Sequence, residues 1–180
     1  VAISEVDTRA LTRLLRDQGA QKGCIMTGDI APQRVIEQAK SSANIVGVDL
    51  AMGVTTGRVH AWECARSWAG ELPVSMSSEA PHVVVYDFGV KRGILRALQA
   101  RGCHVTVVPA TTPAKEVDAL SPDGVVFSNG PGDPAACESI LSLIPDILAL
   151  NKPVLGICLG FQLLALHFGA TVKKMKFGHH

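Results

Sequence analysis

Short, continuous apolar segments alternate with amphipathic ones along the second half of the chain. Apolar runs bounded by turn residues predict buried strands, and apolar positions spaced three and four apart predict helices. The strands are expected at 83–86, 105–108, 124–127 and 154–157, and the helices at 91–101, 113–120, 134–150 and 159–168. Pro145 predicts a break or kink in the third of these helices. Such alternation is typical of an α/β fold in which helices cover both faces of a mostly parallel sheet.

The first part of the chain shows shorter and weaker patterns. Asp7 is placed to cap a helix that Gly19 would end, and Pro32 suits the first turn of a second helix. These helices are expected at 7–18 and at about 32–40, and a short strand is expected at 24–26. Another short strand is expected near the other end of the chain, at 172–177. Between 41 and 81 no period persists, which predicts an irregular connection that ends in a linker near 71–81.

Length and composition narrow the class of protein. With 180 residues, the chain is long enough for one domain and a remainder. Its 17 basic and 16 acidic residues leave a net charge of +1, which offers no electrostatic footprint for nucleic acid or an anionic membrane. Hydrophobic residues make up 47%, enough for a packed core, yet no apolar run approaches the roughly 18 residues of a membrane helix. No secretory leader opens the chain and its five cysteines form no C-x-x-C pair, so we expect a reduced, cytoplasmic protein.

The strongest chemical signal is the motif Gly156-Ile157-Cys158-Leu159-Gly160 at a predicted strand-to-helix junction. It has the spacing of the G-x-S-x-G nucleophile elbow, with Cys in place of Ser. The turn would raise the Cys158 side chain above the sheet, and the start of the next helix would favour the thiolate form. The backbone N–H of Leu159 would face the space where an oxyanion forms. The competing interpretation is a buried structural cysteine in a Gly-rich turn.

A second signal lies in the loop Ser128–Pro134, directly after the strand expected at 124–127. It is no phosphate-binding P-loop, because no Gly-Lys-Ser/Thr follows it. Two glycines and two prolines predict a rigid loop that can hold one backbone N–H toward a reacting carbonyl, although a plain strand-exit turn would look similar. The six histidines show no metal-ligand spacing with acids or cysteines, so no metal site is expected.

These two motifs resemble those of the class I, triad-type glutamine amidotransferases. Residues 156–162 are similar to the nucleophile motif of that family, and residues 129–134 to its oxyanion loop. Further stretches resemble the small, glutamine-hydrolysing subunit of carbamoyl-phosphate synthase, and they lie at 7–16, 19–25, 86–96 and 174–180. The resemblance covers essentially the whole chain, and it implies that the final His pair is native sequence and not a tag.

The resemblance implies an enzymatic role for named residues. Cys158 would attack the amide carbon of L-glutamine, giving a γ-glutamyl thioester and ammonia. The N–H groups of Gly130 and Leu159 would form the oxyanion hole, and Gln162 would help to hold the substrate. Ammonia would pass to a large synthetase subunit that forms carbamoyl phosphate for arginine and pyrimidine biosynthesis. The resemblance implies no cofactor in this chain, because ATP and Mg would bind to the large subunit.

The resemblance also implies a domain organisation. Residues 1–45 would be the tail of a separate N-terminal domain, 46–81 a connecting segment with the linker, and 82–180 the first part of the amidotransferase domain. The catalytic His and Glu of the family lie in a downstream Gly-His-Pro-Glu-type motif, and no such motif occurs before His180. We therefore expect the 180-residue chain to be inactive alone.

Two other hypotheses stay open beside the glutaminase. One is a non-catalytic, partner-binding subunit, which the presence of Cys158, Gly130 and Gln162 disfavours. The other is an amidotransferase subunit of a different pathway, which the stretch at 7–25 disfavours. Phe161 stands where the small subunit usually has His, but that position varies in the wider family, so it does not imply loss of activity.

Overall fold

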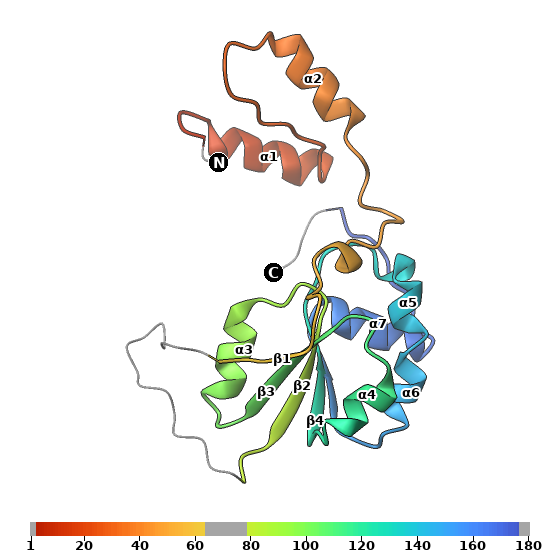
Figure 1. The fold of residues 1–180 in the computed structure, drawn as a ribbon. Coiled ribbons are helices and arrows are strands. Elements are labelled where there is room, and N and C mark those ends of the chain that lie inside the picture. The colour runs from red at the N-terminus through yellow and green to blue at the C-terminus, as the bar shows by residue number, and fades with distance from the viewer. Residues whose placement is uncertain (1–2, 64–78, 177–180) are drawn as a thin grey trace. The chain divides into compact units, whose positions relative to one another are not determined.

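The computed structural model describes residues 3–63 and 79–176 of the chain. The chain divides into two compact units (Figure 1). One contains the described residues of 1–44 and 173–180, and the other is Ile45–Val172. The motifs that carry the predicted chemistry lie in the second unit, which we call the sheet unit.

The sheet unit is built on a five-stranded sheet with the order β1-β3-β2-β4-β5. Its strands are β1 (His60–Ala61), β2 (His82–Asp87), β3 (His104–Pro109), β4 (Gly124–Phe127) and β5 (Val154–Gly156). All neighbours are parallel except β1, which is antiparallel to β3. Tyr86 of the central strand lies between Val108 of β3 and Phe127 of β4. The carboxyl ends of β2, β4 and β5 therefore meet at the same edge, where parallel sheets place their ligand sites.

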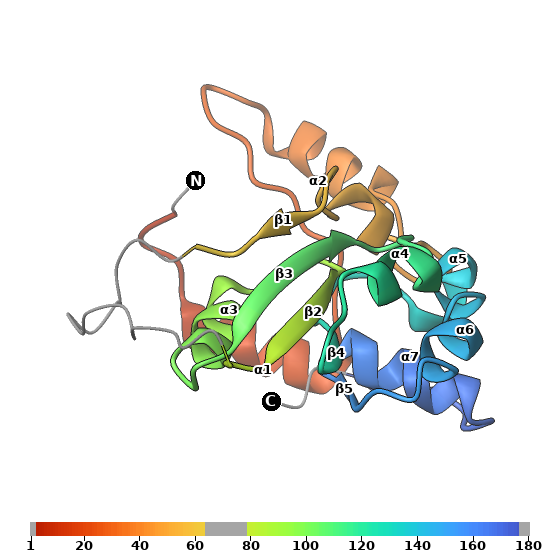
Figure 2. The ribbon, with the colours of Figure 1, turned by 60° about the horizontal axis from the view of Figure 1, so that its bottom comes forward.

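Helices cover both faces of this sheet, as Figure 2 shows. The helical segments are α3 (Arg92–Gln99), α4 (Ala114–Ala119), η2 (Pro134–Ala136), α5 (Glu138–Leu141), α6 (Ile144–Leu148) and α7 (Leu159–His167). α3 lies on one face, where Leu95 packs with Val85 and Val126. α4, α5, α6 and α7 lie on the other, over the alternate strand residues such as Tyr86 and Phe127. This two-sided burial explains why the strands are continuously apolar.

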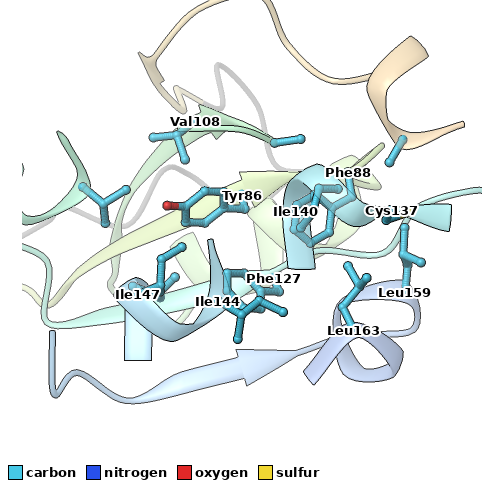
Figure 3. Packing of buried hydrophobic residues seen from close by; sticks show 14 of the residues in the cluster. Tyr86, Phe88, Val108, Phe127, Cys137, Ile140, Ile144, Ile147, Leu159 and Leu163 are labelled. Atoms are coloured by element: carbon cyan, nitrogen blue, oxygen red, sulfur yellow. The ribbon is translucent and has the colours of Figure 1, made fainter. Parts of the chain in front are cut away.

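The rings of Tyr86, Phe88 and Phe127 form the centre of the larger core (Figure 3). Their centroids lie 5.3–6.3 Å apart. The Tyr86 hydroxyl donates to the carbonyl of Thr112 at 2.8 Å, and burial raises the pKa of this hydroxyl. Leu159 and Leu163 of α7 extend the same core to the carboxyl edge of the sheet. The residues of the predicted site therefore lie directly on a closely packed core.

The sequence predicted most of the sheet unit correctly, with two exceptions. The single helix expected at 134–150 is wrong, because the structure has three short helical segments there. The break expected near Pro145 is confirmed, since α5 ends at Leu141 and Pro145 lies in the first turn of α6. The connection also contains more structure than expected, since it forms η1 (Ala51–Gly53) and strand β1. The predicted linker at 71–81 falls largely on residues outside the described part.

The described part of the other unit contains two helices, α1 (Thr8–Gln18) and α2 (Pro32–Ser41), close to the predicted bounds. Asp7 caps α1 as expected, because its side chain accepts a hydrogen bond from the Ala10 N–H at 2.8 Å. The strands expected at 24–26 and 172–177 are wrong in the described residues, which have no regular structure there. A strand needs a neighbouring strand for its N–H and C=O groups, and the described part of this unit provides none.

Candidate active site

Cys158 occupies the turn between β5 and α7. The residue is exposed and acts as the N-cap of α7, with φ 53° and ψ −109°. A positive φ is uncommon for a residue with a Cβ and costs on the order of 1–3 kcal/mol, so it persists where the surroundings impose it. The strand-to-helix turn with an outward, strained residue is the backbone geometry of a nucleophile elbow. The structure thus excludes the alternative of a buried Cys158.

The two glycines of the motif allow the backbone segments around Cys158 to touch. A Cβ on Gly156 would lie 2.7 Å from backbone atoms of Gly160 and Phe161. A Cβ on Gly160 would lie against the carbonyl oxygen of Phe127, at the end of β4. The Gly160 N–H also donates to the carbonyl of Ser128 at 3.1 Å. The lack of a side chain at these two glycines therefore allows backbone segments to come into contact, and this contact fixes the turn against the end of β4.

The loop after β4 brings Gly130 to the same turn. A Cβ on Gly130 would lie 2.7 Å from Cδ2 of Leu159 and against the carbonyl oxygen of Phe88. Within the described ranges, neither the Gly130 N–H nor the Leu159 N–H has a hydrogen-bond acceptor. A backbone N–H without a protein acceptor is able to donate to an oxyanion. The structure thus places the predicted residues Cys158, Leu159 and Gly130 together.

Side-chain hydrogen bonds hold this loop to the exit of β2. The Phe88 N–H donates to Ser128 Oγ at 2.9 Å. The Lys91 N–H donates to Asn129 Oδ1 at 2.9 Å, and Asn129 Nδ2 donates to the carbonyl of Gly89 at 3.0 Å. Our sequence reasoning assigned no role to Ser128 or Asn129. The sequence did contain a signal for them, because both residues directly follow β4, a strand parallel to β2, and polar residues at such strand ends tend to meet.

Asp87 organises the other side of the β2 exit. Its carboxylate accepts from the N–H groups of Gly89 and Val90 through Oδ1, and from the Thr56 N–H through Oδ2, at 2.8–2.9 Å. The residue is buried, so these three donors satisfy a carboxylate that would otherwise be costly to desolvate. Asp87 thereby fixes the Asp87-Phe88-Gly89 turn, which lies under Gly130. Nothing in the local sequence pattern pointed to Thr56 as a partner.

Gln162 lies one helical turn after Cys158, on the same side of α7. Its N–H donates to the carbonyl of Cys158 at 3.0 Å, and the residue is half-buried. No acceptor or donor for its side-chain amide occurs among the described residues. Phe161 is 63% exposed beside it. The predicted substrate-binding amide is therefore close in the fold to the thiol and available to a ligand.

The family follows from a comparison with known protein families. Residues 84–180, more than half of the chain, match the model of the class-I glutamine amidotransferases. The chain belongs to this family. The match begins within β2 and includes every residue predicted for the site. The mostly parallel sheet with helices on both faces is consistent with this class I amidotransferase fold.

Several curated relatives of this amidotransferase chain carry the name carbamoyl phosphate synthase small chain. The chain is 52% identical to that protein of Pasteurella multocida over 180 residues, and 55% identical to that of Pectobacterium atrosepticum over 186 residues. Identity to the Escherichia coli K12 protein is 51% over 185 residues. In each case all of this chain is covered, but only 47–48% of the relative. The chain thus spans about half the length of the curated relatives it matches.

The other cysteines of this amidotransferase chain differ from Cys158 in their surroundings. Cys137 is fully buried in the core beside Phe88 and Leu159 (Figure 3). Burial raises the pKa of the Cys137 thiol to about 12, and the nearby carboxylates of Asp49 and Asp133 add to this effect. Cys24 and Cys103 are half-buried. Cys158 is thus the exposed thiol among the cysteines that the structure describes.

No group of three or more His, Cys, Asp or Glu in residues 3–63 and 79–176 could hold a metal ion. None of the helices described there has the length and apolar character needed to cross a membrane. His179 and His180 lie outside the described residues.

Proposed function

We propose that the sheet unit carries the glutaminase reaction of a carbamoyl phosphate synthase small chain. The Cys158 sulfur attacks the side-chain amide carbon of L-glutamine, and a tetrahedral oxyanion forms. The C–N bond then breaks, the nitrogen leaves as ammonia after taking up a proton, and a γ-glutamyl thioester remains. Water adds to the thioester carbon, the C–S bond breaks, and glutamate leaves while the thiol is restored. Covalent catalysis of this kind divides one difficult step into two easier ones.

The proposal rests above all on the strained, exposed Cys158 at the strand-to-helix turn. The N–H groups of Gly130 and Leu159 are the donors for the oxyanion, because both are unengaged and their residues touch. One such donor is worth about 10²–10³ in turnover. Gln162 binds the substrate through its free amide. The proton-transfer base is not assigned to any described residue.

The product ammonia is proposed to serve a large synthetase subunit. The relatives are called small chains, which supports a larger partner. That partner would bind ATP and Mg and would convert bicarbonate and ammonia to carbamoyl phosphate for arginine and pyrimidine biosynthesis. No cofactor is assigned to this chain. A cytoplasmic location agrees with cysteines that form no C-x-x-C pair.

The test is Cys158→Ser in the whole natural polypeptide together with its synthetase partner. Glutamine-dependent synthesis should fall by at least about 10⁴-fold, because a site that activates a thiol does not activate the less acidic hydroxyl of serine. Synthesis from added ammonia should persist, since it needs no amide cleavage. Cys24→Ser provides the matched control and should leave both activities unchanged. Loss of neither activity in Cys158→Ser would favour the non-catalytic, partner-binding subunit.

A further inference from the structure

The segment Gly47–Leu50 runs along the loop after β4 and is bonded to it through Asp133. The Asp133 carboxylate accepts from the Gly47 N–H through Oδ2 at 2.9 Å. The Asp133 N–H in turn donates to the carbonyl of Val48 at 3.1 Å. The first bond joins positions 86 residues apart in the sequence, and both bonds lie within the sheet unit.

Close backbone contact accompanies these bonds. Gly132 has φ +103°, and a Cβ there would lie 2.8 Å from the Leu50 nitrogen and 2.9 Å from the Val48 oxygen. The loop therefore touches the segment without an intervening side chain. Asp133 also caps η2, because its Oδ1 accepts from the Ala135 N–H at 3.0 Å. The cap uses Oδ1 alone, so the bond from the Gly47 N–H to Oδ2 is a separate contact of the same carboxylate.

The loop is thus fixed at both of its ends. Asn129 is bonded to Lys91 and Gly89 on the β2 side, and Asp133 to Gly47 and Val48 on the other. Between these anchors stand only Gly130, Pro131 and Gly132. Proline has a fixed φ, so little freedom remains for the Gly130 peptide once both ends are held.

We propose that Asp133 is a positioning residue for the oxyanion, because its tether to Gly47–Leu50 sets the direction of the Gly130 N–H. It acts through Gly130 and touches no substrate itself. The proposal rests on the glutaminase function proposed above. An oxyanion donor acts in the transition state, so a misdirected N–H lowers kcat and leaves substrate binding nearly intact.

The test compares Asp133→Ala with Asp123→Ala in the whole natural polypeptide. Asp123 also accepts a backbone bond, from the His82 N–H at 2.7 Å, but at the amino end of β2. Asp133→Ala should lower the kcat of glutamine hydrolysis by about 10–100-fold, less than loss of a whole donor, and should change KM by less than about threefold. Asp123→Ala should leave kcat unchanged. Asp133→Asn, which keeps one carbonyl acceptor, should recover part of the loss and serves if the alanine variant does not fold.

Two reagents distinguish an effect of Asp133 on the direction of the Gly130 N–H from an effect on the stability of the fold. L-glutamate γ-semialdehyde forms a hemithioacetal as the Cys158 sulfur bonds to its carbonyl carbon, whose oxygen takes the thiol proton and occupies the oxyanion hole. Its affinity should fall in parallel with kcat in the Asp133 variants. Iodoacetamide alkylates the same sulfur with loss of iodide and develops no oxyanion, so its rate should not change. Amide exchange at Gly47 should increase in the Asp133 variants only.

The outcomes are distinguishable. Wild-type kcat and semialdehyde affinity in a folded Asp133 variant would overturn the positioning role, as would an equal loss in Asp123→Ala. Hydrolysis that survives Cys158→Ser would instead overturn the glutaminase function. A fall in semialdehyde affinity with unchanged iodoacetamide reactivity supports the positioning role.

Discussion

Two neighbouring segments present the candidate oxyanion donors, and they are held by different forces. The loop after β4 carries Gly130 and is fixed by hydrogen bonds between the side chains of Asn129 and Asp133 and the backbone of two other segments. The turn after β5 carries Leu159 and is fixed by backbone contact at Gly156 and Gly160. Both segments need close backbone approach, at Gly130 and Gly132 in the loop and at Gly156 and Gly160 in the turn, but only the loop is held by polar side chains as well. The difference implies that an added side-chain atom in the turn prevents its packing, whereas the loop still folds when one side-chain hydrogen bond is removed.

Gly160→Ala should have the largest effect on stability. Its Cβ would press on the carbonyl of Phe127, which cannot move without breaking β4, so the free energy of unfolding should fall by more than about 3 kcal/mol, the upper end of usual overpacking costs. Urea unfolding measures this. Gly93→Ala on α3 is the control, because a Cβ there meets nothing within 4 Å, and it should be neutral or stabilising. A Gly160→Ala protein as stable as wild type would contradict the steric account of the turn.

Asn129→Ala should have a moderate effect on stability. It removes the bonds to the Lys91 N–H and the Gly89 carbonyl, which should lower the free energy of unfolding by about 1–3 kcal/mol in urea titrations. Gln21→Ala is a suitable control, since the Gln21 amide bonds two carbonyls within one turn, and its loss should cost less than about 0.5 kcal/mol. Equal costs for the two variants would show that the loop is not held in the way described.

Replacement of Cys158 by Gly and by Ala measures the strain in the turn. Glycine adopts positive φ freely and alanine does not, while both remove the thiol. The Gly variant should be more stable than the Ala variant by about 1–2 kcal/mol, after the extra chain entropy of glycine is subtracted from the strain. Thermal or urea unfolding of the two proteins gives the difference. An Ala variant of equal or greater stability would mean that the turn imposes no strain.

The smallest expected effect is the contribution of the buried Cys137 thiol to folding stability, which changes only at high pH. Its thiol has a pKa of about 12 in the folded protein, above the ordinary value of 9.0, so the folded state retains a proton that the unfolded state releases. Stability is therefore full below pH 9 and declines as the pH rises toward 12, with a loss on the order of 1 kcal/mol between pH 9 and 10. Cys137→Ala should remove this part of the pH slope. An identical slope in both proteins would show that Cys137 is not the source.

The sequence predicted the strands of the parallel sheet because each is a continuous apolar run, and it predicted the Cys158 turn because two glycines flank the cysteine at a strand end. It did not predict β1, since His60 and Ala61 become a strand only through pairing with Val107 and Thr106 of β3. It also missed the tether of Gly47–Leu50 to Asp133. In each of these contacts at least one partner is a backbone group that is distant in sequence, and backbone groups leave no residue pattern.

The segment 45–56 has a practical consequence for fusing or excising the sheet unit. Ala51 is fully buried in the main core, Thr56 donates to Asp87, and Thr55 Oγ1 accepts from the Ala110 N–H at 2.8 Å. A recombinant junction at the start of β2 would look natural from the apolar pattern. It would remove all of these partners, leaving a hole in the core and a buried carboxylate without one of its donors. Junctions belong before Ile45, and a gene fusion made there keeps the scaffold of the thiol intact.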